Sequence, residues 1–477
     1  MDASEHAVRA AGSGGGPVRA PRAFLAQPRH RMAVWALVFA GCWTAAAVKI
    51  AGVTGADGLV VGVPLAAAPV PLVVGTFLLL TKARPQPWPH LAFALAWGAG
   101  AGAMAALYAN SWSIDAIVER ADERQAELLG LTVVAPFVEE AAKGAAVLLL
   151  LAFRRHWFRG PLDGLVLAAT TAAGFAFTEN VLYFGRAFGE ADGGAASQTA
   201  AIFVGRAVLT PFAHPLFTSA IGLALGCGVL MRRRAYAVGT ALGGYLVAVG
   251  LHAGWNAAAW KSAAEDDPLI MLGVYFAVML PLLAGLFVLG ARLRRTQLDA
   301  VARQLPYYVR AGWLTWNEAV MLGSVTDRGR QRDAADARFG KRGLRLMRQY
   351  QWNATALAEL RDRTERGHVT PDAFTPRERV LLHRLWSARM PLHDVLTYIV
   401  PTPRWAAAPG GRPPHAGMVW APPGAWPAGT PYPPAPGHAA PNAYRAPPAV
   451  HGGPAAHAWE RPQAAERTTQ QPSASPP

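Results

Sequence analysis

Mostly apolar stretches of about 20 residues recur along the chain as far as residue 290, and each is long enough to cross a hydrocarbon core of roughly 30 Å. They predict eight membrane-spanning helices. These helices cover residues 32–48, 59–80, 89–109, 132–153, 162–184, 200–230, 237–260 and 269–290. The predicted fold is therefore an all-α, polytopic membrane helix bundle.

The flanking segments differ from this pattern. Residues 1–31 are rich in Gly, Arg and Ala without the apolar core of a cleavable signal, and they predict a disordered arm before the membrane domain of residues 32–290. Residues 291–400 are Arg-rich and mixed in polarity, which favours a small helical region. Residues 401–477 are dominated by Pro, Ala and Gly, and this composition is typical of a disordered tail.

Basic residues are concentrated on every second connection between the predicted spans. Since Lys and Arg are retained on the cytoplasmic side, both termini are predicted to be cytoplasmic in a cell-membrane protein. The clusters are Arg29 with Arg31, Lys82 with Arg84, Arg154 and Arg155 with Arg159, Arg232 to Arg234, and Arg292 with Arg294 and Arg295.

The net charge of +15 resides largely in these connections and in residues 291–400. Anionic lipids of the inner leaflet are the expected partner of this charge. No nucleic-acid partner is expected, because no recognition motif accompanies the basic residues. Cys42 and Cys227 both fall within predicted spans, so the sequence suggests neither a disulfide framework nor a thiolate metal site.

Ionisable residues interrupt four of the apolar spans, at Glu139, Glu140 and Lys143, at Glu179, at His214 and at His252. A charge at the centre of a membrane helix costs roughly 2.5 to 3.5 kcal/mol unless a partner compensates it. The predicted orientation places most of these groups in the outer half of the bilayer. They are therefore predicted to face one buried, hydrated cavity.

The local spacing supports this interpretation. Lys143 follows Glu139 by four residues and Glu140 by three, so its ammonium reaches either carboxylate on one helical face. His252 and Asn256 share a face in the same way, and Pro211 and Pro215 flank His214. Proline leaves helix carbonyls without a donor, which membranes tolerate beside protein or water.

Each feature also has a purely structural explanation. A Glu–Lys pair can neutralise itself, and an intramembrane His or Asn can join two helices. Arg206 is predicted to extend to the outer interface. The structural explanation does not account for three carboxylates, one ammonium and two imidazoles at nearly one depth, because that set has a formal charge of about −2 when its histidines are neutral.

The ordered motifs resemble those of the PrsW family of intramembrane proteases, which are distant relatives of the prenyl-protein CAAX endopeptidases. The resemblance covers residues 130–260. Its motifs are E-E-A-A-K at Glu139 to Lys143, D-G at Asp163 and Gly164, G-F-A-F-T-E-N at Gly174 to Asn180, His214, and H-A-G-W-N at His252 to Asn256.

The resemblance implies hydrolysis of a peptide bond in or near the membrane. One glutamate of the pair would be the general base, oriented by Lys143, and the analogy with CAAX enzymes favours Glu139 over Glu140. His252 and Asn256 would stabilise the oxyanion. In a metal-dependent version, Glu179, His214 and His252 would hold Zn²⁺, because a His, His, Glu set with water is known for catalytic zinc. The sequence leaves the metal-free glutamate mechanism open.

The expected substrate is a single-span membrane protein, cut near its outer end, and PrsW-like proteins are associated with site-one cleavage of anti-sigma factors. The alternative function is a proton- or ion-coupled transporter in which the buried carboxylates form a relay. Against a transporter, the halves show no inverted repeat and the polar residues are confined to four spans. An inactive protein that holds a partner helix in the same cavity is a third possibility.

Overall fold

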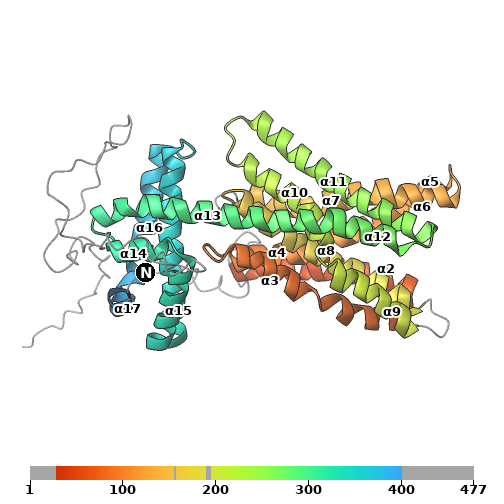
Figure 1. Cartoon of the computed structure of the whole chain (residues 1–477), viewed down its shortest axis with the longest axis horizontal. Coiled ribbons are helices and arrows are strands. Elements are labelled where there is room, and N and C mark those ends of the chain that lie inside the picture. The colour runs from red at the N-terminus through yellow and green to blue at the C-terminus, as the bar shows by residue number, and fades with distance from the viewer. Residues whose placement is uncertain (1–27, 155–156, 190–194, 400–477) are drawn as a thin grey trace, which may run out of the picture. The chain divides into compact units, whose positions relative to one another are not determined.

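The computed structural model describes residues 28–154, 157–189 and 195–399, and every regular element in these ranges is a helix (Figure 1). The all-α membrane bundle is thus confirmed. The chain forms two compact units, with the boundary after Thr296. The predicted tail of residues 401–477 lies outside the described residues, as does the predicted arm up to residue 27.

Unit 1 is built from helices that are often interrupted by short π-helical turns. The elements are α2 (Pro28–Ala67), α3 (Val70–Leu80), α4 (Trp88–Trp97), η1 (Gly98–Gly102), α5 (Ala103–Val118), α6 (Glu123–Leu129), η2 (Gly130–Val134), α7 (Ala135–Arg154), α8 (Pro161–Gly189), α9 (Ala195–Phe203), η3 (Val204–Leu209), α10 (Ala213–Gly228), α11 (Arg234–Ala264), α12 (Pro268–Val274), η4 (Tyr275–Met279) and α13 (Leu280–Arg310).

Six helical stretches of the described residues are long and apolar enough to cross a membrane. The first of them, Met32–Leu80, is interrupted at Gly55, whose φ of 72° and ψ of 170° are open to glycine almost alone. In the half of α2 before Gly55, Trp43 stacks on Phe177 and Thr54 lies against Gly185. Since the contact positions rise together along both helices, this half runs parallel to α8.

The second half of that stretch runs the opposite way. Phe77 and Leu80 pack with Leu162 and Leu165, which lie near the start of α8. The stretch is therefore two antiparallel passages. Helix α7 is a further passage, which is less apolar because it carries Glu139, Glu140 and Lys143. The described residues thus contain six candidate spans, and the reversal in the first of them and helix α7 lie where the hydrophobic pattern predicts two further spans.

Helix α8 is the centre of unit 1, and most of its residues are buried. It contacts α2, α3, α4, α7, α9 and α10. Its crossing with α10 is close because glycines meet there: a Cβ built on Gly164 would lie 1.9 Å from the carbonyl oxygen of Gly222. Small residues at such crossings let helix backbones approach in membranes. The crossing fixes the position of α10, which carries His214.

Unit 2 is a small helical domain with its own core. It contains the end of α13, α14 (Trp316–Leu322), α15 (Val325–Glu365), α16 (Pro371–Arg389), the 3₁₀ turn η5 (Met390–Leu392) and α17 (His393–Tyr398). A capping box of Thr315 and Glu318 starts α14. The core packs Leu305 and Tyr308 of α13 against Tyr350 and Leu357 of α15. This predicted helical region is thus built around buried apolar residues.

Adding one methyl group at the α8–α10 crossing should separate the two helices. Gly164→Ala is expected to destabilise the protein by about 1–3 kcal/mol or more, because the new Cβ meets backbone rather than a flexible side chain. Gly239→Ala in α11 is the matched control, since nothing lies within 4 Å of its built Cβ. Thermal unfolding in detergent measures both variants, and equal melting temperatures would contradict the close packing.

Candidate active site

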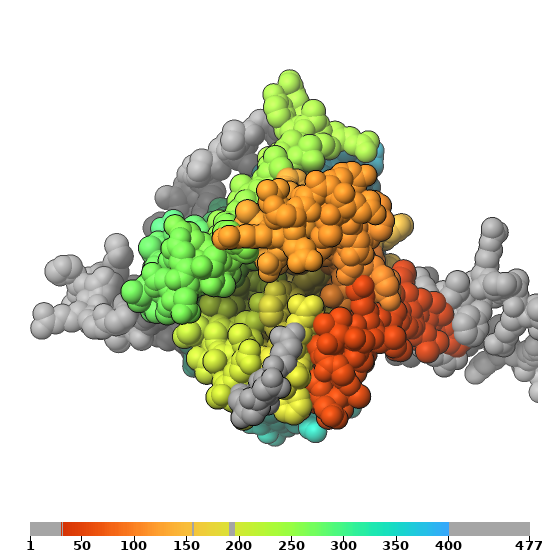
Figure 2. All heavy atoms as spheres, turned by 90° about the vertical axis from the view of Figure 1, so that its right-hand side faces the viewer, coloured from red at the N-terminus to blue at the C-terminus, as the bar shows by residue number. Residues whose placement is uncertain are grey.

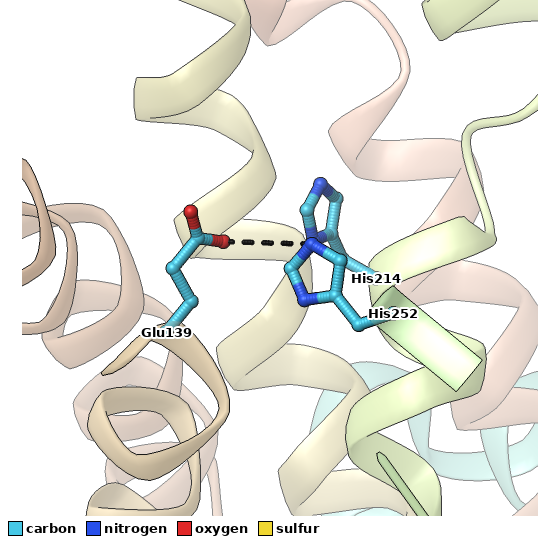
Figure 3. A group of neighbouring side chains, drawn as sticks. All are labelled: Glu139, His214 and His252. Carbon is cyan, nitrogen blue, oxygen red and sulfur yellow. Dashed lines mark ion pairs between the residues drawn. The ribbon is translucent and has the colours of Figure 1, made fainter. Parts of the chain in front are cut away.

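Four helices of unit 1 bring their ionisable side chains together in its interior. Helix α7 contributes Glu139, Glu140 and Lys143, α8 contributes Glu179, α10 contributes His214, and α11 contributes His252. Figure 3 shows Glu139 pointing toward the two imidazoles, whose ring centroids are 5.3 Å apart. Six of the seven residues that the sequence predicts for the site thus form one cluster.

Lys143 is the central cation of this cluster and is completely buried. Its Nζ lies 2.7 Å from Glu140 Oε1, 3.4 Å from Glu139 Oε2 and 3.1 Å from His214 Nδ1. The ammonium also sits 4.3 Å from the centroid of the Phe175 ring, a cation–π contact. One side chain therefore links both glutamates of its own helix to α10.

The carboxylate of Glu140 is occupied by protein groups. Its Oε1 accepts a hydrogen bond from Lys143 and lies 3.1 Å from His252 Nδ1. Its Oε2 accepts a hydrogen bond of 2.8 Å from the hydroxyl of Thr218. With both oxygens engaged and no exposed surface, Glu140 holds Lys143 and His252 in place.

Glu139 has the opposite environment, although it is the neighbouring residue. Its Oε1 accepts a hydrogen bond of 3.3 Å from the amide of Asn110. Its Oε2 is buried and has no hydrogen-bond partner among the described residues, with Lys143 Nζ at 3.4 Å and His252 Nε2 at 3.9 Å. A buried carboxylate oxygen without a donor is available for a water, a substrate group or a cation.

The carboxylate of Glu179 pairs with His214 and with Arg206. It lies 2.7 Å from His214 Nε2 and 3.0 Å from Arg206 Nη2. Arg206, which the sequence predicts to extend to the outer interface, has partners within the bundle: its Nε donates a hydrogen bond of 2.6 Å to Asn180, and its guanidinium stacks on Tyr183. These partners hold the partly exposed arginine beside Glu179.

Arg206 changes the charge of the site. Three carboxylates and two permanent cations leave a formal charge of −1 when both histidines are neutral, in place of the −2 counted without the arginine. The net negative charge of the site is therefore one unit smaller than the charge counted from the sequence.

Asn256 is the predicted site residue that lies apart from the cluster. Its Nδ2 donates a hydrogen bond of 2.9 Å to the carbonyl oxygen of Leu131, in the π-helical turn before α7. Tyr245 similarly donates to the carbonyl oxygen of Phe137. These two bonds fasten α11 to the segment that carries Glu139, so Asn256 positions His252 rather than contacting the reacting groups.

Sequence reasoning assigned no role to Asn110 and Thr218, which contact the two glutamates. Thr218 follows His214 by four residues and shares its helical face, which was a usable signal. Asn110 lies at the end of a predicted span, and nothing in its spacing relates it to α7. Trp97 also supports α7, by donating a hydrogen bond to the carbonyl oxygen of Ala142.

Glu139, His214 and His252 form the candidate metal site. One ligand atom from each residue lies within 4.8 Å of the others. The glutamate in this set is Glu139, whereas the sequence predicted Glu179, whose carboxylate instead contacts Arg206 and His214.

The donor set fits a divalent metal such as Zn²⁺ in chemistry. The unpartnered Oε2 of Glu139 supports the fit, as does the Glu140 carboxylate behind His252, which is the usual support for a ligating imidazole. The ammonium of Lys143 lies beside Glu139 and His214, so it competes with a metal for the same donors.

A pocket reaches the cluster beside His214. The pocket is small and partly open to solvent, and Arg206, Asn180, Phe177 and Trp255 line it together with apolar residues of α2 and α3. Figure 2 shows a hollow at one end of unit 1. The segments around this hollow are α2, α5, α6, α8, α9 and α12. The interior groups thus lie next to space that a ligand can occupy.

A multi-pass membrane bundle with a buried acid–base cluster beside a pocket is the arrangement that an intramembrane hydrolase needs. Residues 86–286 match the model of the family described as PrsW family intramembrane metalloprotease. This segment is less than half of the chain, but it contains the entire cluster, and the match supports a peptidase. No curated protein and no solved structure matches the chain. The family match confirms the resemblance seen in the motifs and does not support a transporter.

Metal binding distinguishes the two possible glutamate ligands. Glu139→Gln should abolish binding of Zn²⁺ by the purified protein, because it removes a ligand atom of the candidate set. Glu179→Gln should weaken binding only by roughly 10- to 100-fold, as expected for a residue that supports a ligating histidine. Equilibrium dialysis with elemental analysis measures both.

The exposed Glu265 provides the control, since Glu265→Gln should leave zinc binding unchanged. Stronger loss in Glu179→Gln than in Glu139→Gln would contradict the assignment of Glu139.

Proposed function

We propose that this PrsW-family peptidase hydrolyses a peptide bond of a single-span membrane protein, with Glu139 as the residue that accepts the proton from the attacking water. The observation that carries this proposal is the asymmetry of the glutamate pair. Glu140 is saturated by three protein groups, whereas Glu139 Oε2 is buried without a hydrogen bond. A general base must have an oxygen within reach of water.

The surrounding residues have distinct roles in this proposal. Lys143 holds positive charge 3.4 Å from Glu139, where it orients the carboxylate and stabilises negative charge that develops on the substrate carbonyl. Glu140 fixes Lys143 and the ring of His252. Because Nδ1 of His252 faces Glu140, its Nε2 faces Glu139 and accepts or returns a proton across that gap.

The predicted oxyanion role needs revision for Asn256. Its amide is bonded to Leu131, so it acts through the placement of α11. Lys143 and the protonated form of His252 are the donors nearest to Oε2 of Glu139.

In a metal-dependent reaction Glu139 would instead be a ligand, together with His214 and His252, and Zn²⁺ bound there would activate water and polarise the substrate carbonyl. The residues around the metal would hold its ligands in position. Glu140 would orient His252, Glu179 would support His214, and Thr218 would fix Glu140.

The pocket beside His214 suits a polypeptide segment that has left its helical conformation. Its walls are mixed, with apolar side chains beside the polar groups of Arg206, Asn180 and His214. Such groups bind the backbone amides that an unwound segment exposes, since a membrane interior offers no other partners. A single-span protein cut near its outer end is the proposed substrate, and an anti-sigma factor is the proposed example.

The location follows from the distribution of basic residues on the connections. We place the protein in the cell membrane with both termini in the cytoplasm. The site then opens toward the outer side, where Glu139 lies early in a helix that enters from that side.

Co-reconstitution in liposomes with candidate single-span proteins tests the proposal. Glu139→Gln should lower kcat/KM by roughly 10²- to 10⁴-fold, the usual contribution of a general base, and should still capture substrate. Glu265→Gln, on the surface, should cleave like the parent.

Undiminished cleavage by Glu139→Gln would remove the proposed base. Capture of substrate without cleavage by the parent would instead indicate a protein that only holds its partner.

A further inference from the structure

Helix α15 is a tight hairpin rather than one rod. At Gly340 the backbone has φ 60° and ψ −154°, a conformation essentially restricted to glycine. The two arms pack against each other: Gln351 donates hydrogen bonds to the carbonyl oxygen of Arg328 and to the side chain of Gln331, and a Cβ on Gly343 would lie 2.2 Å from the carbonyl oxygen of Ala335. The turn therefore projects from the core of unit 2.

The turn and its two flanks, residues 336–348, form what we call the hairpin tip. It carries five exposed basic side chains and one exposed acidic side chain, Asp336. None of the five basic side chains has an ion pair with another described residue. They are Arg338, Lys341, Arg342, Arg345 and Arg348.

Two further observations describe the charge and the exposed surface of the hairpin tip. The pKa of Arg332, just before the tip, is lowered by partial burial and by the nearby charge of Arg348. Phe339 is 38% exposed at the turn itself, next to Arg338. An exposed aromatic residue among cations is typical of surfaces that enter a membrane interface.

We propose that the hairpin tip binds anionic lipid headgroups of the bilayer that contains unit 1. The basic side chains pair with phosphates, and Phe339 enters the interface. A bilayer is favoured over a nucleic acid because the candidate spans of unit 1 anchor the same chain in one. Helix α13 is continuous from Leu280, within the last candidate span, to Arg310, beside the core of unit 2. Such a tether gives the headgroups a high effective concentration.

The experiment uses the full chain in nanodiscs of phosphatidylcholine alone or mixed with phosphatidylglycerol. A fluorophore is attached to Ala337→Cys in a Cys42→Ala, Cys227→Ala background, and quenching by headgroup spin labels reports the fraction of tips at the surface. Quenching should be stronger with phosphatidylglycerol and should fall with added salt.

The double variant Arg342→Gln, Arg345→Gln should lower the ratio of bound to free tips about 30-fold, from roughly 1 kcal/mol per basic residue. The matched control is Arg377→Gln, Arg384→Gln on α16, which changes the net charge equally at exposed positions. It should leave quenching unchanged.

Three outcomes would overturn the proposal. These are equal quenching in both lipid mixtures, an equal effect of the control pair, and binding of an RNA duplex by the tip without a response to phosphatidylglycerol. Equal melting temperatures of the two double variants exclude unfolding as the cause. The assay requires no substrate, so its result is independent of peptidase activity.

Discussion

The ammonium of Lys143, buried among carboxylates and an imidazole, is the interaction on which the rest of unit 1 depends. A lysine at this depth is stable only when negative groups surround it, and two of the three glutamates lie within 3.4 Å. Because its partners extend from α7 to α10 and, through Glu140, to α11, the charge balance also sets how these helices are arranged. The contacts that compensate the charge of Lys143 are therefore the same contacts that bring the site residues of α7, α10 and α11 together.

The same arrangement gives two adjacent glutamates different chemistry. Their positions differ by one residue, which rotates Glu140 toward Thr218 and His252 and Glu139 toward Asn110 and the space near His252. Both oxygens of Glu140 are hydrogen-bonded, whereas Oε2 of Glu139 has an ion pair with Lys143 but no hydrogen bond from a described residue, which leaves Glu139 the more reactive of the two. Helical geometry therefore separates a supporting residue from a reacting one without any difference in residue type.

The sequence predicts the helical class and the eight passages because apolar runs of bilayer length are a strong signal. It also predicts that buried charges meet, since an isolated charge in a span is costly. It could not predict which carboxylate faces which imidazole. The exchange of Glu179 for Glu139 in the candidate ligand set depends on Arg206, whose side chain turns inward to Glu179. Residue spacing along one helix carries no information about such contacts between helices. For the same reason, the sequence does not indicate the contact of Asn110 with Glu139 or that of Asn256 with Leu131.

The order of these partners along the chain has a consequence for biogenesis. Helix α7 is synthesised before α8, α10 and α11, and His252 follows Glu140 by 112 residues. When α7 leaves the ribosome, its three charged groups can compensate one another only within that helix, and no imidazole is yet present. The complete set of partners that compensates the charges of α7 therefore exists only after the segment around His252 has been translated.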